Sequence, residues 1–439
     1  MNMKKRLLCI LTAGALCFTL SACGLLGDGY QNTVAGDETS LPAAQSVRLT
    51  VFTLFEDMEY KALVDEFAAQ NTNITVSDRS QGYSDAAAET LALMLQSDDP
   101  PDVVFYHTGE GAQAFIEQGL FVPLDEIRQT YPDYAEGILP VAISSAAGQG
   151  DAYAVPVRGF YEGLYVHTEL FTQVNLPLPT TFDELLKVVE TFADSGIVPI
   201  AASLSQTPHY LLDHLMLAQG GTSEFLAVPA TAQQVPQSWY TAQDRLKALY
   251  EKGAFGKDAD TISGAQATEL FINKQAAMRV DGSWLTARME DEGTDSDVEV
   301  MSFPGVLEGE LVGGFSSGFF ITRSAWEDTA KRGAAVAFVN ALTDPAAVAR
   351  LCGAQHLPAA RISAQNGTAL ARSAEKLTSG MRFITLPVDA RLPQDAWLAV
   401  TDKTLAIASG KADVREVYEA AFSWSISRKG INIYRVKTI

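Results

Sequence analysis

Hydrophobic and polar positions in the first part of the chain follow two periods, one typical of strands and the other of helices. Residues 47–53 alternate and are rich in β-branched side chains, which predicts a strand. Residues 56–70 place apolar side chains at helical spacing, and both patterns then repeat. The further strands are predicted at 74–76 and 102–106, and the further helices at 83–96 and 111–118. This alternation predicts an α/β lobe with a parallel sheet.

Ligands of such a sheet bind beyond the carboxyl ends of its strands. That rule points to the polar and aromatic residues that directly follow the three predicted strands. These candidates are Phe55, Glu56, Asp57, Gln81, Tyr83, Tyr106, His107, Thr108 and Glu110.

A different pattern occupies residues 151–184. A short apolar strand ends at Pro156, a charged and aromatic segment follows at 158–162, and a second strand comes next. A Pro-rich loop then leads to a helix whose capping box, residues 181–184, satisfies two otherwise unpaired backbone donors. A polar segment between strands suits a cleft wall at a crossing between two lobes, although an ordinary strand–loop–strand fits the local pattern as well.

The rest of the chain predicts a second α/β lobe and two further crossings. The predicted strands are 198–201, 276–280 and 298–303, and the predicted helices are 182–192, 208–218, 239–250, 394–409 and 413–425. Residues 311–322 would return the chain to the first lobe, and 356–359 would form the last crossing. Capping patterns at 324–327 and at Asp344 predict two more helix starts. The end, 427–439, differs because it carries four basic residues and no acidic one.

Composition places the 439-residue chain among globular proteins, with 47% hydrophobic and 19% charged residues. The net charge of −21, without a basic stripe in the body, argues against a nucleic-acid partner. The N-terminus has a basic start and an apolar stretch too short to span a membrane. It ends at Cys23 in a pattern typical of bacterial lipoproteins, where two acyl chains would give stable anchoring. A plain secretory signal peptide is the alternative.

Removal of that segment would leave Cys352 as the one cysteine of the folded part that is not acylated, which excludes an internal disulfide. Residues 23–46 are small and polar and predict a flexible tether. No other segment reaches about 18 apolar residues, so none is predicted to cross a membrane.

One motif competes for an enzymatic interpretation. Residues 314–318 form a G-x-S-x-G pattern around Ser316, and Asp344 and His356 follow in the order of a hydrolase triad. A nucleophile elbow requires a helix after the motif, whereas residues 319–322 predict a strand. The remaining histidines are scattered and predict no metal cluster. A Ser316 hydrolase is therefore the weaker alternative.

Together these segments resemble the bacterial extracellular solute-binding proteins of the maltose- and oligosaccharide-binding type. The resemblance rests on residues 151–184, 101–124, 281–284 and 396–411 and covers roughly 47–425. It implies an α/β, two-lobed periplasmic-binding-protein-like (type II) fold with three crossings between the lobes. The implied parts are a signal peptide at 1–22, a tether at 23–46, lobe one at 47–156 with 313–352, lobe two at 157–312 with 353–425, and a basic tail at 426–439.

The resemblance also implies which side chains meet the solute. Aromatic rings cover the C–H faces of sugars while carboxylates bind the hydroxyls. Taken singly, each aromatic here is more often a core residue, but four match family positions in the correct order. Arg158 and Glu110 depart from the usual family residues. The predicted ligand-binding set is Trp284, Trp397, Tyr210, Tyr106, Glu56, Asp57, Glu110, Arg158, Tyr161, Glu162 and Asp281.

The function that the resemblance implies is that of a lipid-anchored monomer on the outer side of the cell membrane, or in the periplasm. It would bind a carbohydrate without any cofactor and deliver it to an ABC transporter permease by hinge closure. A polyamine, a phosphate ester or a metal chelate remains open as the solute, and Arg158 facing the cleft would favour an anion. A sensor that imports nothing also fits.

Overall fold

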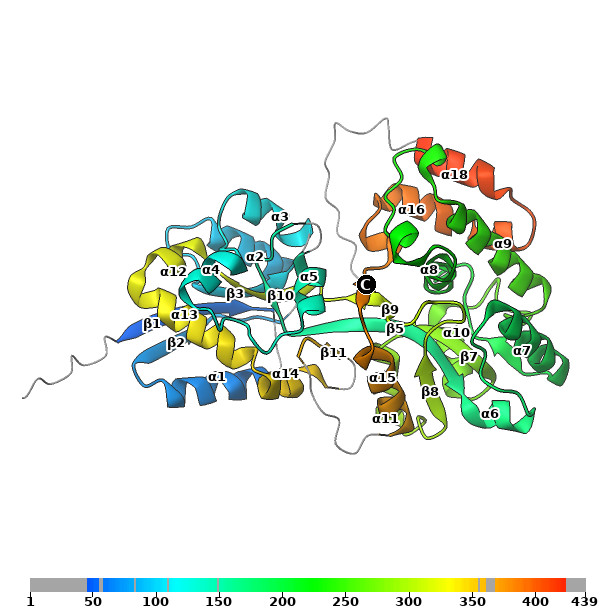
Figure 1. Cartoon of the computed structure of the whole chain (residues 1–439), viewed down its shortest axis with the longest axis horizontal. Coiled ribbons are helices and arrows are strands. Elements are labelled where there is room, and N and C mark those ends of the chain that lie inside the picture. The colour runs from blue at the N-terminus through cyan, green and yellow to red at the C-terminus, as the bar shows by residue number, and fades with distance from the viewer. Residues whose placement is uncertain are drawn as a thin grey trace, which may run out of the picture. The chain divides into compact units, whose positions relative to one another are not determined.

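The computed structural model describes residues 46–54, 58–82, 84–108, 110–147, 150–353, 356–360 and 368–423. Two sheets with surrounding helices organise this part of the chain (Figure 1). The predicted signal peptide, Cys23, Glu56, Asp57 and the basic tail lie outside the described residues.

The first sheet has the strand order β2-β1-β3-β10-β4. Its strands are β1 (Val47–Thr53), β2 (Ile74–Asp78), β3 (Val103–His107), β4 (Val155–Pro156) and β10 (Ser317–Ile321). β1 pairs in parallel with β2 and β3, as predicted, but β10 runs antiparallel to β3 and β4. The sheet is therefore mixed, because a strand that arrives from the second sheet is inserted between β3 and β4.

Helices with the predicted apolar faces pack on this sheet. The helices of this part are α1 (Met58–Gln70), α2 (Asp85–Leu95), α3 (Glu110–Glu117), α4 (Leu124–Thr130), α5 (Pro140–Ala147), α12 (Arg323–Glu327), α13 (Thr329–Leu342) and α14 (Pro345–Cys352). α1 buries Tyr60, Leu63, Val64 and Phe67. The ring of Phe67 meets that of Phe338 in α13 edge to face at 5.2 Å. Residues far apart in the sequence therefore pack together in one hydrophobic core.

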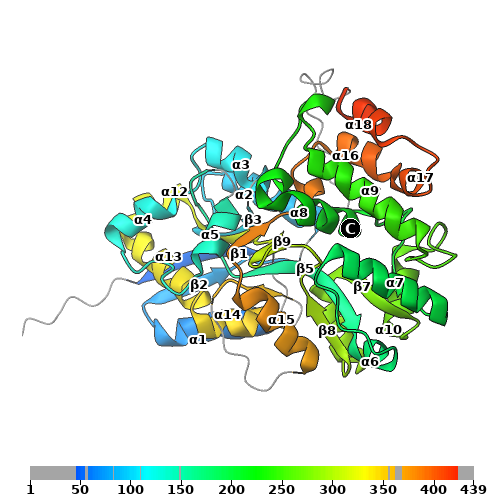
Figure 2. The ribbon, with the colours of Figure 1, turned by 45° about the vertical axis from the view of Figure 1, so that its right-hand side comes forward.

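The second sheet has the order β12-β9-β5-β7-β6, and β8 and β11 also pair with β5. Its strands are β5 (Arg158–His167), β6 (Val198–Ile200), β7 (Ala276–Gly282), β8 (Val298–Met301), β9 (Glu310–Gly314), β11 (Leu357–Pro358) and β12 (Phe383–Thr385). Its helices are α6 (Thr168–Gln173), α7 (Phe182–Ser195), α8 (His209–Phe225), α9 (Gln237–Glu251), α10 (Gly264–Ile272), α11 (Trp284–Glu292), α15 (Ala369–Ser379), α16 (Gln394–Thr401), α17 (Thr404–Ala408) and α18 (Val414–Ser423), with 3-10 turns η1 (Ala232–Gln234) and η2 (Val388–Ala390). Helices α8, α9, α16 and α18 gather on one side of this sheet (Figure 2).

The prediction of a polar loop at 158–162 is wrong. These residues belong to β5, which runs unbroken to residue 167 as a long strand (Figure 1). Gly159 pairs with Leu357 of β11, and Phe160 pairs with Gly314 of β9. Partners from distant parts of the chain therefore complete the backbone hydrogen bonds, which local sequence does not reveal.

The chain passes between the two sheets three times, as predicted: from β4 to β5, from β9 to β10, and from α14 to β11. The backbones at these crossings pack closely. A Cβ atom on Gly159 would lie 2.3 Å from the Gly314 carbonyl oxygen, and one on Gly313 would lie 2.3 Å from that of Phe160. Glycine is therefore required at these crossings, because a side chain would collide with the neighbouring backbone. The residues after Ser316 form strand β10, whereas a nucleophile elbow requires a helix at this position.

Helix starts agree with the predictions in two cases and differ in one. The capping box at Thr181 is present, and Glu184 accepts a hydrogen bond from the Thr181 backbone N–H at 3.1 Å. Asp344 caps α14 through the N–H of Ala346 at 2.8 Å. The capping box expected at 324–327 is wrong: Thr322 caps α12, and the side chain of Asp328 then caps a second helix, α13.

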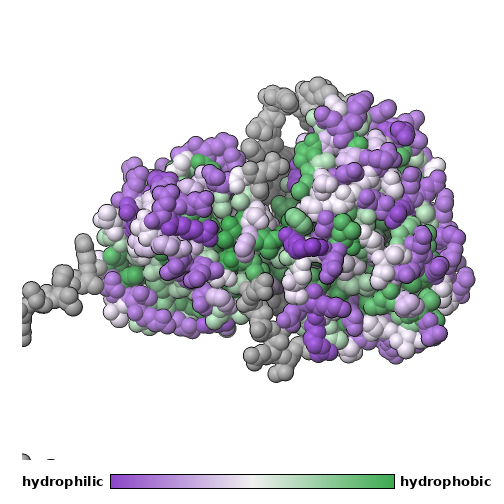
Figure 3. Space-filling model, in the orientation of Figure 1, coloured by the Kyte–Doolittle hydropathy of each residue, from purple (hydrophilic) through white to green (hydrophobic). Residues whose placement is uncertain are grey.

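Hydrophilic side chains cover much of the face shown in Figure 3. Within the described residues, no single helix is long and apolar enough to cross a bilayer. In this part of the chain, α13 and α14 taken together meet those limits of length and composition, and they are bent by 59° relative to each other.

Candidate ligand-binding site

The indole of Trp284 forms an exposed aromatic surface at the start of α11. Trp284 is 43% exposed, and its ring lies directly on the backbone of Gly282, where an added Cβ would be 2.1, 2.2 and 2.4 Å from three ring carbons. Phe160 and Tyr210 flank it, each with its ring centroid 6.1 Å from that of Trp284. β5, α8 and α11 thus each contribute one aromatic ring to the same place.

Asp281 fixes the orientation of this indole. Its Oδ1 accepts hydrogen bonds from the indole Nε1–H of Trp284 at 2.7 Å and from the backbone N–H of Gly282 at 2.8 Å. Its Oδ2 accepts from the guanidinium of Arg279 at 2.6 Å, and Arg279 also donates to the carbonyl of Ala201. Asp281 and Arg279 are buried. The carboxylate is therefore paired, hydrogen-bonded and locked in place, which lets it position the ring.

A buried carboxyl group lies in the same sheet, beside the aromatic rings. Glu162 is directly opposite Gly282 in the β5–β7 register, so both positions share one face of the sheet. Burial raises the pKa of Glu162 well above its usual range, and the charges of Asp213, Asp281 and Asp389 add to the effect. Its Oε2 atom has no hydrogen-bond partner among the described residues. The carboxyl group therefore stays protonated and neutral at pH values above its ordinary pKa.

One face of α8 covers Glu162. Tyr210, Asp213 and His214 share that face because they lie three and four residues apart. Nδ1 of His214 lies 3.9 Å from Oε2 of Glu162. Burial lowers the pKa of His214 to about 4, although the carbonyls of Tyr210 and Glu162 oppose the shift. Burial also raises the pKa of Asp213, with Asp389 adding to it and the Val388 N–H opposing it.

The half-buried rings of His209 and Tyr210 complete the site, with their centroids 4.3 Å apart. Burial lowers the pKa of His209, against the charges of Asp389 and Asp281. A neutral imidazole can both donate and accept a hydrogen bond. Burial, followed by the charges of Asp281 and Glu162, raises the pKa of Tyr210, which keeps its phenol protonated and able to donate.

The structure therefore brings four of the predicted residues together: Trp284, Tyr210, Asp281 and Glu162. Sequence reasoning missed Phe160, His209, Asp213, His214 and Asp389 as members of the site. A signal was present for two of them, because Asp213 and His214 share a helix face with the predicted Tyr210.

Other predicted residues lie elsewhere. Trp397 is 3% exposed and packs in the core around the second sheet, and Tyr161 is buried with its hydroxyl 3.1 Å from that of Thr286. Arg158 donates to the carbonyl of Leu351, at the third crossing. Tyr106 is the penultimate residue of β3, with its ring centroid 6.0 Å from that of Phe115, and Glu110 begins α3.

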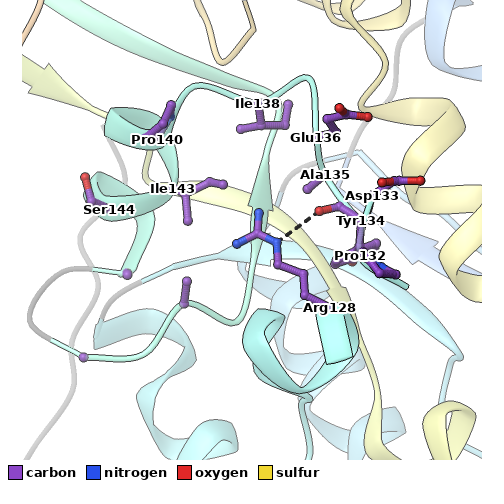
Figure 4. A pocket seen from close by; sticks show the side chains of 13 residues that line it. Arg128, Pro132, Asp133, Tyr134, Ala135, Glu136, Ile138, Pro140, Ile143 and Ser144 are labelled. Atoms are coloured by element: carbon purple, nitrogen blue, oxygen red, sulfur yellow. Dashed lines mark hydrogen bonds between the residues drawn. The ribbon is translucent and has the colours of Figure 1, made fainter. Parts of the chain in front are cut away.

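A hollow in the first part of the chain contains none of the predicted ligand-binding residues. It has a volume of about 610 Å³ and lies between α4, α5 and the segment that joins them. Figure 4 shows the Arg128 side chain reaching into it, where its Nε–H donates to the carbonyl of Tyr134 at 3.2 Å. Among the residues that the structure describes, no group of three or more His, Cys, Asp or Glu side chains is arranged to hold a metal ion.

Comparisons with known proteins address the family and the fold. The family model for bacterial extracellular solute-binding proteins matches residues 57–349, which is more than half of the chain. The multiple sugar-binding protein of Streptococcus mutans is 24% identical over 264 residues. That match spans 58% of this chain and 60% of the relative, so the chain matches less than two thirds of the relative's length.

Solved structures share the fold at low sequence identity. A probable secreted solute-binding lipoprotein from Streptomyces coelicolor has a TM-score of 0.75 at 20% identity, covering 87% of this chain and 98% of its own. A family 1 extracellular solute-binding protein from Bifidobacterium longum subsp. infantis has a TM-score of 0.71 at 16% identity, with 87% and 99% covered. The apo form of RafE from Streptococcus pneumoniae has a TM-score of 0.70 at 18% identity, with 88% and 99% covered.

Proposed function

Because this chain belongs to the bacterial extracellular solute-binding protein family, we propose that it binds a carbohydrate at the aromatic site around Trp284. The observation that carries the proposal is the indole of Trp284, which is held open to solvent by Asp281 rather than packed in the core. The multiple sugar-binding protein of Streptococcus mutans, and a RafE structure described as a complex with raffinose, support a sugar as the class of solute.

The geometry suggests how a sugar would be held. The flat rings of Trp284 and Tyr210 offer apolar faces for the C–H side of a pyranose, which large aromatic side chains bind through their buried area. The phenol of Tyr210 and the imidazole of the adjacent His209 offer hydrogen-bonding groups here, and the exposed carboxylate of Asp389 is near enough to affect the pKa of both. Hydroxyls of a saccharide need such donors and acceptors once they leave water. Glu162, which was predicted as a polar contact, is buried and does not form part of this surface. It would support the site from the sheet below.

We further propose hinge closure as the mechanism of binding. The two lobes would comprise 47–156 with 313–352 and 157–312 with 353–425, joined by the three crossings. A solute that contacts residues of both lobes only in the closed form would shift the population toward that form. On the first lobe, Tyr106 and Glu110 stand at the end of β3 and the start of α3, where such contacts would come from. The closed protein would then present the solute to the permease of an ABC importer.

Anchoring through Cys23 completes the proposal. The sequence around Cys23 supports acylation and attachment to the outer side of the cell membrane. Metabolic labelling with a palmitate analogue should mark the full-length chain and fail to mark Cys23→Ser, whereas equal labelling of both would exclude this site.

The test of the sugar site is thermal unfolding of the chain from Ser46 onward against mono- and oligosaccharides. A ligand at 100 times its dissociation constant should add about 2.7 kcal/mol to the free energy of unfolding. We expect Trp284→Ala to abolish the shift. Trp397→Phe is the matched control, because that indole is buried in the core and its substitution should lower stability without changing affinity. Stabilisation by anions or polyamines, and by no saccharide, would contradict the proposal.

A further inference from the structure

A second pocket lies at the far end of α8 from the aromatic site. It has a volume of about 550 Å³ and is lined by the end of α8, by Leu307, by Glu310 at the start of β9 and by Phe383 of β12. Tyr210 and Gly221 are eleven residues apart on α8, which at 1.5 Å per residue corresponds to about 16 Å. The pocket is therefore separate from the proposed sugar site.

A break in α8 creates this pocket. Gly221 has φ 58° and ψ −177°, which interrupts the helix and favours glycine. The nearest atoms to the side-chain position that Gly221 leaves empty are the carboxylate oxygens of Glu310, at 3.5 and 3.7 Å, and Leu307 Cδ1 at 3.9 Å. The absent side chain thus leaves an open space in front of the Glu310 carboxylate.

The carboxylate of Glu310 is only half satisfied. Its Oε1 accepts a hydrogen bond from the backbone N–H of Thr222 at 3.1 Å, just after the break. Its Oε2 and the hydroxyl of Thr222 are buried and have no partner among the described residues. Buried polar atoms are nearly always paired, and an unpaired one points to a water or a ligand at that place.

The walls of the pocket are apolar and accessible. Leu307 is 62% exposed and Phe383 is 55% exposed, although large hydrophobic side chains are usually covered. Among the described residues that line the pocket, Glu310 is the one ionisable side chain. Arg382, which precedes Phe383, donates to the carbonyl of Glu308. A carboxylate beside an exposed aromatic ring is the combination that recognises an organic cation.

We propose that this pocket binds a small organic cation, an alkylammonium group, with Glu310 as its counter-ion and Phe383 against its carbon chain. The volume is in the range of small-molecule sites. Thr222 would accept a second hydrogen bond from the ammonium through its hydroxyl. This site is independent of the proposed carbohydrate function, since no residue of the aromatic site lines it.

The experiment uses 1,4-diaminobutane as the probe and 1,4-butanediol as its neutral counterpart. The reporter is the backbone amide signal of Thr222 in a ¹⁵N-labelled sample, because that N–H is hydrogen-bonded to Glu310. We expect a saturable shift with the diamine, with a dissociation constant of about 1 mM or below for so small a ligand, and at least a tenfold weaker response with the diol. Sodium chloride at equal ionic strength controls for screening.

Two variants decide the result. Glu310→Gln keeps an oxygen that can accept from Thr222 but removes the charge, so the diamine should bind at least about tenfold more weakly. Glu308→Gln removes an exposed carboxylate two residues away and should leave binding unchanged. Trp284→Ala should also leave it unchanged, which separates this proposal from the sugar site. Equal binding of diamine and diol, or an unaltered affinity in Glu310→Gln, would overturn the proposal, and the absence of any saturable shift would show that only water occupies the pocket.

Discussion

A methyl group added at Gly282 would collide with the indole of Trp284. The new Cβ would lie 2.1–2.4 Å from three ring carbons, whereas carbon atoms in contact are normally about 3.5–4.0 Å apart. The ring would have to move by more than about 1 Å. Because the indole is 43% exposed, it can swing toward solvent without opening the core. Gly282→Ala should therefore displace the aromatic surface while the fold survives.

The magnitude follows from the contacts that this movement breaks. The hydrogen bond from the indole Nε1–H to Asp281 Oδ1, 2.7 Å long, would be lost, and bonds to charged groups contribute about 1.5–3 kcal/mol. Asp281 keeps its bond to Arg279, so no unpaired buried charge remains. We expect the free energy of unfolding to fall by about 1–3 kcal/mol. Affinity for a saccharide should fall at least about tenfold, which corresponds to about 1.4 kcal/mol.

The assay compares urea unfolding, calorimetric titration with the saccharide identified by the thermal screen, and acrylamide quenching of tryptophan fluorescence. Quenching should increase in Gly282→Ala because the displaced indole becomes more accessible. Gly380→Ala is the matched control: this glycine has φ −85°, and an added Cβ would meet no atom within 4 Å. It should leave stability, quenching and affinity unchanged.

The reasoning would be refuted if Gly282→Ala bound the saccharide with the wild-type affinity and showed unchanged quenching. That result would mean that the ring does not rest on the Gly282 backbone. Increased quenching with the wild-type affinity would instead mean that the ring moves but does not contact the ligand.

Two further predictions concern the buried acid and the crossings. Burial and the charge of Asp213 raise the pKa of Glu162, so its stabilising contribution is present below the ordinary carboxyl pKa and is lost as the pH rises toward the folded-state pKa. Glu162→Gln should thus gain stability relative to wild type as the pH rises above the ordinary carboxyl pKa in urea unfolding, and a difference independent of pH would contradict this. Gly159→Ala would place a Cβ 2.3 Å from the Gly314 carbonyl oxygen, between two backbones, and should cost at least about 2 kcal/mol; stability equal to that of the Gly380 variant would argue against close packing.

Local patterns determined much of the fold. The period of apolar residues identified α1 and its buried face, and the capping residues Thr181 and Asp344 identified two helix starts. These features depend on neighbours within one or two turns, so a single sequence contains them. The family resemblance and the three crossings also came from segments that are continuous in the chain.

The arrangement of the candidate site was decided by the tertiary structure. Trp284 and Trp397 both lie at or near helix starts, and the sequence assigned both to sugar stacking. Yet Trp397 is 3% exposed in a core, while Trp284 is 43% exposed. The difference arises because Asp281 and Gly282 of β7 hold the Trp284 ring on the surface of the sheet. The spacing of residues along a helix does not reveal this contact.

The acidic group beneath the aromatic rings depends on strand register. Glu162 lies beside the ring because β5 pairs with β7 at Gly282, about 120 residues later in the chain, and α8 then places His214 over it. The predicted loop at 158–162 became a strand for the same reason, since its hydrogen-bond partners belong to β11, β9 and β7. The sequence by itself thus determined the elements and the family. Only the packing of distant segments decided which side chains share a site, because register and burial are properties of contacts and not of local composition.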